Sequence, residues 1–268
     1  MSDWVLENLK ETDSYLFFSK VDPRYPRLGD IIKKAVNKEQ VSNADVVIIG
    51  IPDDTGIKNN KGRPGAAGAP TNVRKYFYKL TTGCFVQPLS KLTIVDAGDI
   101  IIESNIEKTH ERVRQVIARI TESGAIPLCI GGGHDFSHPC VAGIVGAYGL
   151  KKATLGLINI DAHLDVRDLT FGINSGTPHF RTLEMPGTPV NGKNFVEFGI
   201  QEHHNSPEHY KYVKEKLATV MSLYDIHRKG TEEEFNRALR IAGYGTSHIC
   251  VTFDIDATRM ADAPGASA

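Results

Sequence analysis

The stretch TLGLINIDAHLD, residues 154–165, joins a predicted strand to a cluster of metal-binding side chains. Its first half is short, apolar and partly β-branched, which predicts a buried strand. Alternate residues of an extended chain share one face, so Asp161, His163 and Asp165 are expected to project together if the strand continues past Asp161. Two carboxylates and an imidazole suit Mn²⁺, Fe²⁺ or Zn²⁺, and a cation offsets the cost of gathering two negative charges. A strand end whose acidic residues face water is the alternative for this stretch alone.

Two further predicted strands end in the same residue types. Residues 249–253 lead into Asp254-Ile255-Asp256, where two carboxylates again alternate onto one face. Residues 125–130 lead into Gly131-Gly132-Gly133-His134-Asp135. Ligands of open α/β sheets bind outside the carboxyl ends of the strands. One metal with open positions does not need so many ligands, so the pattern predicts two metals that share carboxylates. The six candidate ligands are His134, Asp161, His163, Asp165, Asp254 and Asp256.

Size and composition favour one soluble domain that spans residues 1–268. The formal net charge is −1, which gives no indication of a nucleic acid or an anionic membrane as partner. No apolar run approaches the roughly 20 residues that a bilayer crossing needs, and the N-terminus lacks the pattern of a signal peptide. The cysteines form no CxxC pair, so we expect free thiols in a cytoplasmic protein. They are Cys84, Cys129, Cys140 and Cys250.

Predicted strands alternate with predicted helices from about residue 44 onward. The strands are 46–51, 92–95, 125–130, 154–160, 195–200, 219–223 and 248–253, and the clearest helices are 106–120, 207–217 and 231–241. This alternation predicts an α/β fold, a mostly parallel sheet with helices on both faces. The first 43 residues are less regular and are expected to form an N-terminal cap. Residues 58–65 form a loop of turn formers after a strand, either a surface loop or part of a substrate site.

The ordered motifs resemble those of the ureohydrolase superfamily, which contains arginase, agmatinase and formimidoylglutamase. The matching residues are GGH at 132–134, DAHLD at 161–165, SGTPH at 175–179, FDID at 253–256 and APG at 263–265. The resemblance covers residues 46–268 and implies an arginase-like three-layer fold. Because the sequence stops inside the last motif, we expect it to lack the family's last strand-helix unit. The absence of that unit would leave a sheet edge and apolar faces uncovered.

The resemblance also implies a cofactor of two Mn²⁺ ions. One ion would be held by His134, Asp161, Asp165 and Asp254, and the other by Asp161, His163, Asp254 and Asp256, so that Asp161 and Asp254 bridge. Two cations lower the pKa of a shared water and supply hydroxide for attack on an amidine or guanidine carbon. His179 matches the family's proton-shuttle histidine, a task that suits an imidazole with a pKa near ~6.5. Capping of the following helix is the alternative role for His179.

Within the superfamily the chain resembles formimidoylglutamase most. The details are GGGHD at 131–135, GIQ at 199–201, the loop NKGRPGA at 60–66, and Thr177 where arginases have Asn. The implied reaction is hydrolysis of N-formimidoyl-L-glutamate to L-glutamate and formamide, in histidine breakdown. Arg63 is expected to pair with a substrate carboxylate, and the other candidate substrate-binding residues are Asn60, Ser175 and Thr177.

Three alternative functions remain open at this point. The first is another ureohydrolase that acts on a guanidine, either an arginase or an agmatinase. The second is a metal-binding homologue with impaired catalysis, and the third is a zinc-dependent, deacetylase-like hydrolase of related architecture. The resemblance further implies a homo-oligomer, with a small molecule as the only other partner.

Overall fold

The computed structural model describes residues 4–83, 89–149 and 155–266. The chain forms two compact units. Unit 1 comprises Met1–Thr55 and Pro64–Gly133, and unit 2 comprises Gly56–Arg63 and His134–Ala268. Cys84 and the expected strand start at Thr154 lie outside the described residues, and the single domain over residues 1–268 stays a prediction. The described helices include none with the length and apolar composition that a membrane crossing requires.

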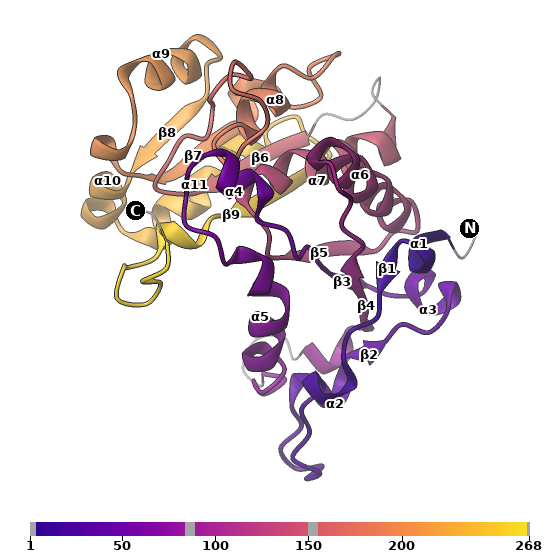
Figure 1. The fold of residues 1–268 in the computed structure, drawn as a ribbon. Coiled ribbons are helices and arrows are strands. Elements are labelled where there is room, and N and C mark those ends of the chain that lie inside the picture. The colour runs from indigo at the N-terminus through magenta and orange to yellow at the C-terminus, as the bar shows by residue number, and fades with distance from the viewer. Residues whose placement is uncertain (1–3, 84–88, 150–154, 267–268) are drawn as a thin grey trace. The chain divides into compact units, whose positions relative to one another are not determined.

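Unit 1 is built on a sheet with the strand order β1-β4-β3-β5 (Figure 1). The strands β3 (Val46–Gly50), β4 (Ile94–Ile100) and β5 (Ile126–Ile130) are parallel. The short strands β1 (Leu9–Lys10) and β2 (Lys33–Lys34) both pair with β4, β1 in the antiparallel direction. The helices are α1 (Trp4–Glu7), α2 (Leu28–Ile31), α3 (Lys38–Ser42), α5 (Ala69–Phe77) and α6 (Ile106–Glu122).

A buried charged cluster lies inside unit 1, at β4. Arg74 of α5 is 1% exposed, and its Nη2 donates to Asp96 Oδ1 at 2.9 Å. Asp99 pairs with the same guanidinium at 2.5 Å. The Tyr78 hydroxyl donates to Asp96 Oδ2 at 2.6 Å, and Thr12 donates to Asp96 Oδ1 at 2.9 Å. Every charge of this cluster therefore has a partner, as burial in a core requires.

Unit 2 contains a wholly parallel sheet with the strand order β8-β7-β6-β9. Its strands are β6 (Leu155–Ile160), β7 (Phe195–Ile200), β8 (Thr219–Ser222) and β9 (His248–Phe253). The helices are α4 (Thr55–Asn59), which starts at the unit boundary, α7 (Ser137–Tyr148), α8 (Pro178–Leu183), α9 (Pro207–Glu215), α10 (Leu223–Lys229) and α11 (Thr231–Gly243).

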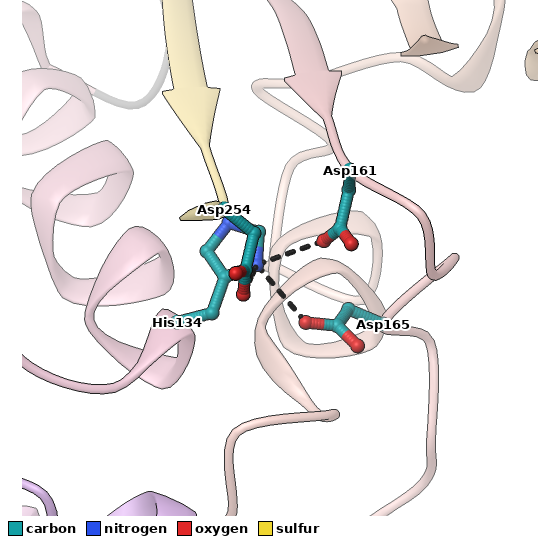
Figure 2. Close-up of side chains that lie close together, drawn as sticks. All are labelled: His134, Asp161, Asp165 and Asp254. Carbon is teal, nitrogen blue, oxygen red and sulfur yellow. Dashed lines mark ion pairs between the residues drawn. The ribbon is translucent and has the colours of Figure 1, made fainter. Parts of the chain in front are cut away.

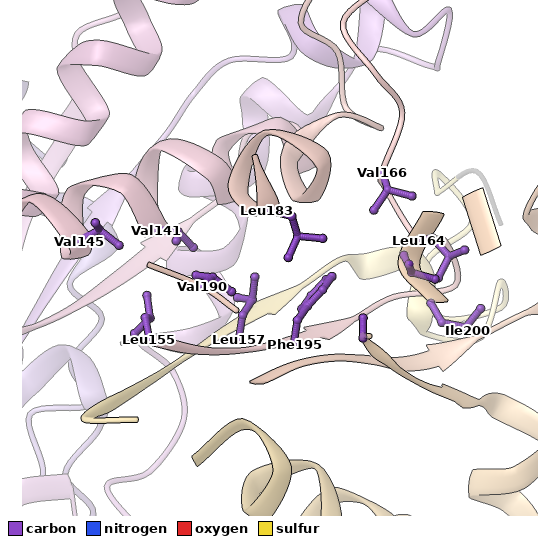
Figure 3. Close-up of a cluster of buried hydrophobic side chains, with 12 residues drawn as sticks. Val141, Val145, Leu155, Leu157, Leu164, Val166, Leu183, Val190, Phe195 and Ile200 are labelled. Atoms are coloured by element: carbon purple, nitrogen blue, oxygen red, sulfur yellow. The ribbon is translucent and has the colours of Figure 1, made fainter. Parts of the chain in front are cut away.

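Helices cover both faces of the unit 2 sheet. On one face, Leu157 and Phe195 lie in a cluster with Val141 of α7 and Leu183 of α8 (Figure 3). On the other face, the neighbouring strand residue Ile158 packs in a second cluster that includes Ala238 and Ala242 of α11. Alternation along β6 thus supplies two apolar cores, and each such buried side chain contributes about 1.5–3 kcal/mol of transfer free energy. The predicted α/β class, mostly parallel with helices on both faces, is confirmed.

The predicted strands and helices are present, although their ends differ, and the structure contains further short strands and helices that were not predicted. The structure extends β4 to Ile100, because Arg74 pairs with the buried carboxylate of Asp96 and with the partly exposed carboxylate of Asp99. The irregular N-terminal segment contributes β1 and β2 to a sheet. At the edge of the unit 2 sheet, β9 carries exposed apolar side chains: Ile249 is 37% exposed, Val251 48% and Phe253 55%.

Candidate metal centre

Two neighbouring parallel strands bring the first two acidic residues together. Ile160 of β6 is in register with Phe253 of β9, so the next residues, Asp161 and Asp254, leave the sheet side by side. The Asp254 amide donates to the Ile160 carbonyl at 2.9 Å, which fixes the two strand ends. Figure 2 shows the two carboxylates at the ends of these strands.

The remaining ligands come from turns. The strand geometry does not persist past Asp161, since β6 ends at Ile160 and Asp165 has a φ of 46°. Asp165 is held there because the His179 amide donates to its carbonyl at 3.0 Å. His134 and Asp256 each lie in a 3₁₀ turn, His134–Phe136 and Ile255–Ala257. The expected convergence therefore occurs, but it depends on turns that follow the strands.

Four of the predicted ligands form a first group around one point: His134, Asp161, Asp165 and Asp254. His134 Nδ1 lies 2.9 Å from Asp161 Oδ2, 3.0 Å from Asp165 Oδ2 and 3.2 Å from Asp254 Oδ2. One ligand atom from each residue lies within 4.8 Å of the others, so one cation can contact all four. Figure 2 shows the carboxylates of Asp161 and Asp165 directed at the imidazole of His134.

A second group consists of Asp161, His163 and Asp256. His163 Nδ1 lies 2.9 Å from Asp256 Oδ2 and 3.6 Å from Asp161 Oδ1. Asp161 therefore belongs to both groups and offers one oxygen to each, which is the arrangement of a bridging carboxylate. The two groups together contain all six predicted ligands. Asp254 lies in the first group, and its expected bridging role stays a prediction.

The electrostatics of the two groups suit cations. Burial would lower the pKa of the His134 ring, but the carboxylates of Asp161, Asp165 and Asp254 raise it well above its usual value. Contacts with Asp161 and Asp256 raise the pKa of His163 to about 10. Burial, reinforced by the charge of Asp161, raises the pKa of Asp165 to about 7. Protons on the imidazoles thus supply the positive charge that a metal would supply in their place.

The buried ring nitrogens of His134 indicate that the cluster is built to bind a cation. Both ring nitrogens are buried, and neither has a hydrogen-bond partner of acceptable geometry among the described residues, despite the short distances to carboxylate oxygens. Buried nitrogens in native proteins usually have a partner. A cation between the imidazole and the carboxylates would provide one, so the donor set fits a metal.

His179 lies beside this centre but is fully buried. It is the second residue of α8, and its ring meets that of His134 edge-on, with 5.4 Å between ring centroids. Its two ring nitrogens have no hydrogen-bond partner among the described residues, and its exposed fraction is 0%. Burial and the positive charge of His134 hold its pKa well below the usual value, which keeps the imidazole neutral. Its proton-shuttle role stays a prediction.

Asn60 connects two other residues of unit 2. Its Nδ2 donates to Ser175 Oγ at 2.9 Å, and its Oδ1 accepts from Arg167 Nη1 at 2.9 Å. The Arg167 amide also donates to the Gly176 carbonyl at 2.8 Å, so the ligand loop and the SGTPH segment are tied together. Sequence reasoning missed Arg167, although its position two residues after Asp165 was a signal that could have revealed it.

Arg63 and Thr177, the other two candidate substrate-binding residues, are engaged elsewhere in unit 2. Arg63 Nη1 donates to the Pro264 carbonyl at 3.3 Å, and Nη2 contacts the Ala266 carbonyl. Thr177 is fully buried, and its hydroxyl donates to the Asn174 carbonyl at 2.8 Å. Their roles in substrate binding stay predictions, and the structure assigns Thr177 to the turn before α8.

Several known proteins are similar to this chain in sequence and in structure. The arginase family model matches residues 44–268. The structure of a Trypanosoma cruzi formiminoglutamase with Mn²⁺ superposes with a TM-score of 0.81 at 33% identity, over 91% of this chain and 80% of that chain. A Geobacillus thermodenitrificans formimidoylglutamase is 33% identical over 82% of this chain and 66% of its own. The mitochondrial agmatinase of Gallus gallus is 31% identical over 82% of this chain and 64% of its own. The chain thus spans about two thirds of the length of these curated relatives.

Proposed function

The chain belongs to the arginase family, and we propose that it hydrolyses the C–N bond of an amidine at a centre of two Mn²⁺ ions. The proposed substrate is N-formimidoyl-L-glutamate, and the products are L-glutamate and formamide. The observation that carries the proposal is the pair of ligand groups that share Asp161. Similarity to the Trypanosoma cruzi formiminoglutamase, solved with Mn²⁺, supports both the metal and the substrate.

The residues present fit the proposed metal. Carboxylates outnumber imidazoles in both groups, which favours Mn²⁺ over softer ions. When bound, two such cations supply a water of lowered pKa and stabilise negative charge that develops on the substrate. The four carboxylates of the cluster carry four negative charges when ionised with neutral imidazoles, so two divalent ions would make the cluster neutral.

The side chains of this chain would hold the reactants and move one proton. Asp161 would keep the two metal positions adjacent through its two oxygens. His179, which is neutral, would accept the proton that the attacking water loses and pass it to the nitrogen of the leaving amine. The fully buried position of His179 excludes bulk water from its ring, so that a transferred proton is not lost to solvent.

Arg167 is the residue we propose for substrate carboxylate recognition. N-Formimidoyl-L-glutamate carries two carboxylates, and a guanidinium binds a carboxylate through two parallel hydrogen bonds. Arg167 is exposed, lies two residues from Asp165, and is steadied by Asn60 at 2.9 Å. Arg63 is the second candidate, from the same unit, although its guanidinium contacts backbone carbonyls near the end of the chain.

The test is release of formamide and glutamate from N-formimidoyl-L-glutamate by Mn²⁺-loaded protein, with arginine and agmatine assayed in parallel. Turnover of the first substrate alone would support the proposal. Turnover of agmatine instead would keep the family chemistry and reject the substrate, an outcome that the similarity to an agmatinase makes worth testing. Two bound metals with no turnover of any of the three would favour a non-catalytic metal-binding role.

Arginine variants would then locate the recognition of the substrate. Arg167→Gln is expected to raise KM by about 10–100-fold with a smaller effect on kcat, because a charge-assisted pair worth about 1.5–3 kcal/mol is lost. Arg228→Gln is the matched control, since Arg228 lies on α10 and pairs with Asp225 at 3.2 Å. An unchanged KM for Arg167→Gln, with a raised KM for Arg63→Ala, would transfer the role to Arg63. Cytoplasmic location and homo-oligomer formation stay predictions.

A further inference from the structure

A row of polar residues crosses the unit 2 sheet directly beneath the metal ligands. Asn159 of β6 is in register with Glu197 of β7 and with Thr252 of β9. Asn159 and Glu197 are 0% exposed and Thr252 is 8% exposed. Two residues earlier on β6 and β7 the same face is apolar, with Leu157 and Phe195 in the core cluster of Figure 3. The polar row therefore interrupts a core that apolar side chains would otherwise complete.

Hydrogen bonds along the row fix the orientation of one amide. Thr252 Oγ1 donates to Asn159 Oδ1 at 2.9 Å. Asn159 Nδ2 donates to Glu197 Oε2 at 2.9 Å and to Asp161 Oδ2 at 3.3 Å. A rotated amide would turn its oxygen toward the Asp161 carboxylate and lose the hydrogen bond from the Thr252 hydroxyl, so the observed orientation is the favoured one.

The orientation of the Asn159 amide determines which Asp161 oxygen faces each ligand group. Asp161 Oδ1 accepts from the His163 amide at 2.7 Å, and Oδ2 accepts from Asn159. Each oxygen thus has one protein donor and retains a lone pair. Oδ2 faces the first ligand group, at 2.9 Å from His134 Nδ1, and Oδ1 faces the second, at 3.6 Å from His163 Nδ1. A carboxylate that bridges two metals needs this division of its lone pairs.

The polar row lowers the stability of the fold relative to an apolar core, which indicates that it has another role. Glu197 Oε1 is buried without a hydrogen-bond partner among the described residues. A buried oxygen in that condition costs about 1–3 kcal/mol, and replacing both partners of a buried hydrogen bond by apolar groups of the same shape can be nearly neutral or stabilising. A sheet core alone would not require Asn159 or Glu197 at these positions.

We propose that Asn159, clamped between Thr252 and Glu197, is a positioning residue that fixes the Asp161 carboxylate between the two metal positions. The inference rests on the metal centre of the proposed function and is independent of the substrate. Partners that orient metal ligands typically contribute 10–100-fold to metal affinity or activity. The structure assigns that task to a residue two positions before the ligand, on the same strand.

Thr252 offers the matched pair of variants. Thr252→Val keeps the shape of the side chain and removes the hydroxyl, whereas Thr252→Ser keeps the donor to Asn159. Metal-free protein is titrated with MnCl₂ while free Mn²⁺ is followed by its electron paramagnetic resonance signal. Thr252→Val is expected to weaken Mn²⁺ binding by about tenfold or more and to diminish the spin-coupled signal of the metal pair. Thr252→Ser is expected to retain both.

Asn159→Leu removes the clamped amide itself, and Asn194→Leu is its control. Asn194 is also buried in unit 2, where its Nδ2 donates to the Tyr244 carbonyl at 2.7 Å and the Ile241 carbonyl at 3.2 Å. Both variants are expected to lower the melting temperature of the metal-free protein. Only Asn159→Leu is expected to weaken Mn²⁺ binding, by about 10–100-fold.

Three results would overturn the inference or separate it from the proposed function. Equal Mn²⁺ affinity for Thr252→Val and Thr252→Ser, or for Asn159→Leu and Asn194→Leu, refutes the positioning role even if the wild type turns over N-formimidoyl-L-glutamate. Wild-type protein that binds two Mn²⁺ ions without turnover, together with the expected variant effects, refutes the substrate and supports the positioning role. Wild-type protein that binds no Mn²⁺ refutes both.

Discussion

Loading the metal-free protein with two Mn²⁺ ions is expected to release about two protons at pH 7.5, because metal ligands must be deprotonated. His163 contributes one proton, since Asp161 and Asp256 raise its pKa to about 10. His134 contributes the other, since burial is outweighed by three carboxylates that raise its pKa well above the usual value. Asp165, with a pKa of about 7, adds about a quarter of a proton.

The sign of the pH dependence follows from these pKa values. Protons compete with Mn²⁺ for imidazoles that remain protonated below their raised pKa values, so apparent affinity increases as pH rises. With two protons released, the overall association constant for two ions is expected to rise by about a hundredfold per pH unit between about pH 7.5 and 9. Lowering the pH below 7 adds a proton on Asp165 and steepens the loss.

Calorimetric titration at pH 7.5 in buffers of different ionisation enthalpy measures the proton count directly. The slope of apparent binding enthalpy against buffer ionisation enthalpy should correspond to about two protons per two ions. His163→Asn should reduce the slope by about one proton. His248→Gln should leave it unchanged, because His248 stacks on Tyr148, with ring centroids 4.2 Å apart, and belongs to neither ligand group. A slope near zero for the wild type would refute the assignment of both histidines as ligands.

Three further perturbations test stability and ligand sharing. Mn²⁺ at 100 times the dissociation constant should stabilise the folded protein by about 2.7 kcal/mol per site. Removal of the metal with EDTA should therefore lower the melting temperature. A melting temperature that EDTA does not change would contradict a metal-bound native state. Arg74→Met should lower the free energy of unfolding, measured in urea, by about 3–5 kcal/mol, because it leaves the Asp96 carboxylate buried without its cation. A decrease no greater than that caused by Arg24→Met, at an exposed arginine, would contradict this prediction. Asp161→Ala should abolish binding of both ions, whereas Asp256→Ala should weaken the second group alone; equal stoichiometry in the two variants would contradict the shared carboxylate.

The strands and the convergence of the six candidate ligands were predictable because each rests on a short local pattern. Mostly apolar runs of six residues mark β6 and β9, and these neighbouring parallel strands place their carboxyl ends at one edge of the unit 2 sheet. The backbone conformation that brings the Asp165 carboxylate into the metal centre was not predictable. It depends on a left-handed residue, with a φ of 46°, and on a backbone hydrogen bond from His179, a partner distant in sequence.

Contacts between polar side chains far apart in the sequence were the main features that the sequence concealed. Asn60 and Arg167 meet through a hydrogen bond that spans more than a hundred residues, and nothing local to either position indicates it. Arg63 was predicted from its loop, yet the structure places its guanidinium against backbone carbonyls. Side-chain partners of this kind depend on tertiary packing, which local propensity does not encode.

The strand β6 explains why the centre forms where it does. On one face its alternate residues run Leu155, Leu157, Asn159 and then Asp161, so the environment changes from apolar core to hydrogen-bonded amide to ionised carboxylate within three steps. A carboxylate placed directly on the apolar layer would face a large desolvation cost. The buried amide between them supplies a donor to Asp161 and keeps its lone pairs aligned before any cation arrives. Because that orientation is established during folding, metal binding need not order the bridging ligand. For this reason we expect loss of the Thr252 hydroxyl to weaken the binding of Mn²⁺ more than it destabilises the sheet.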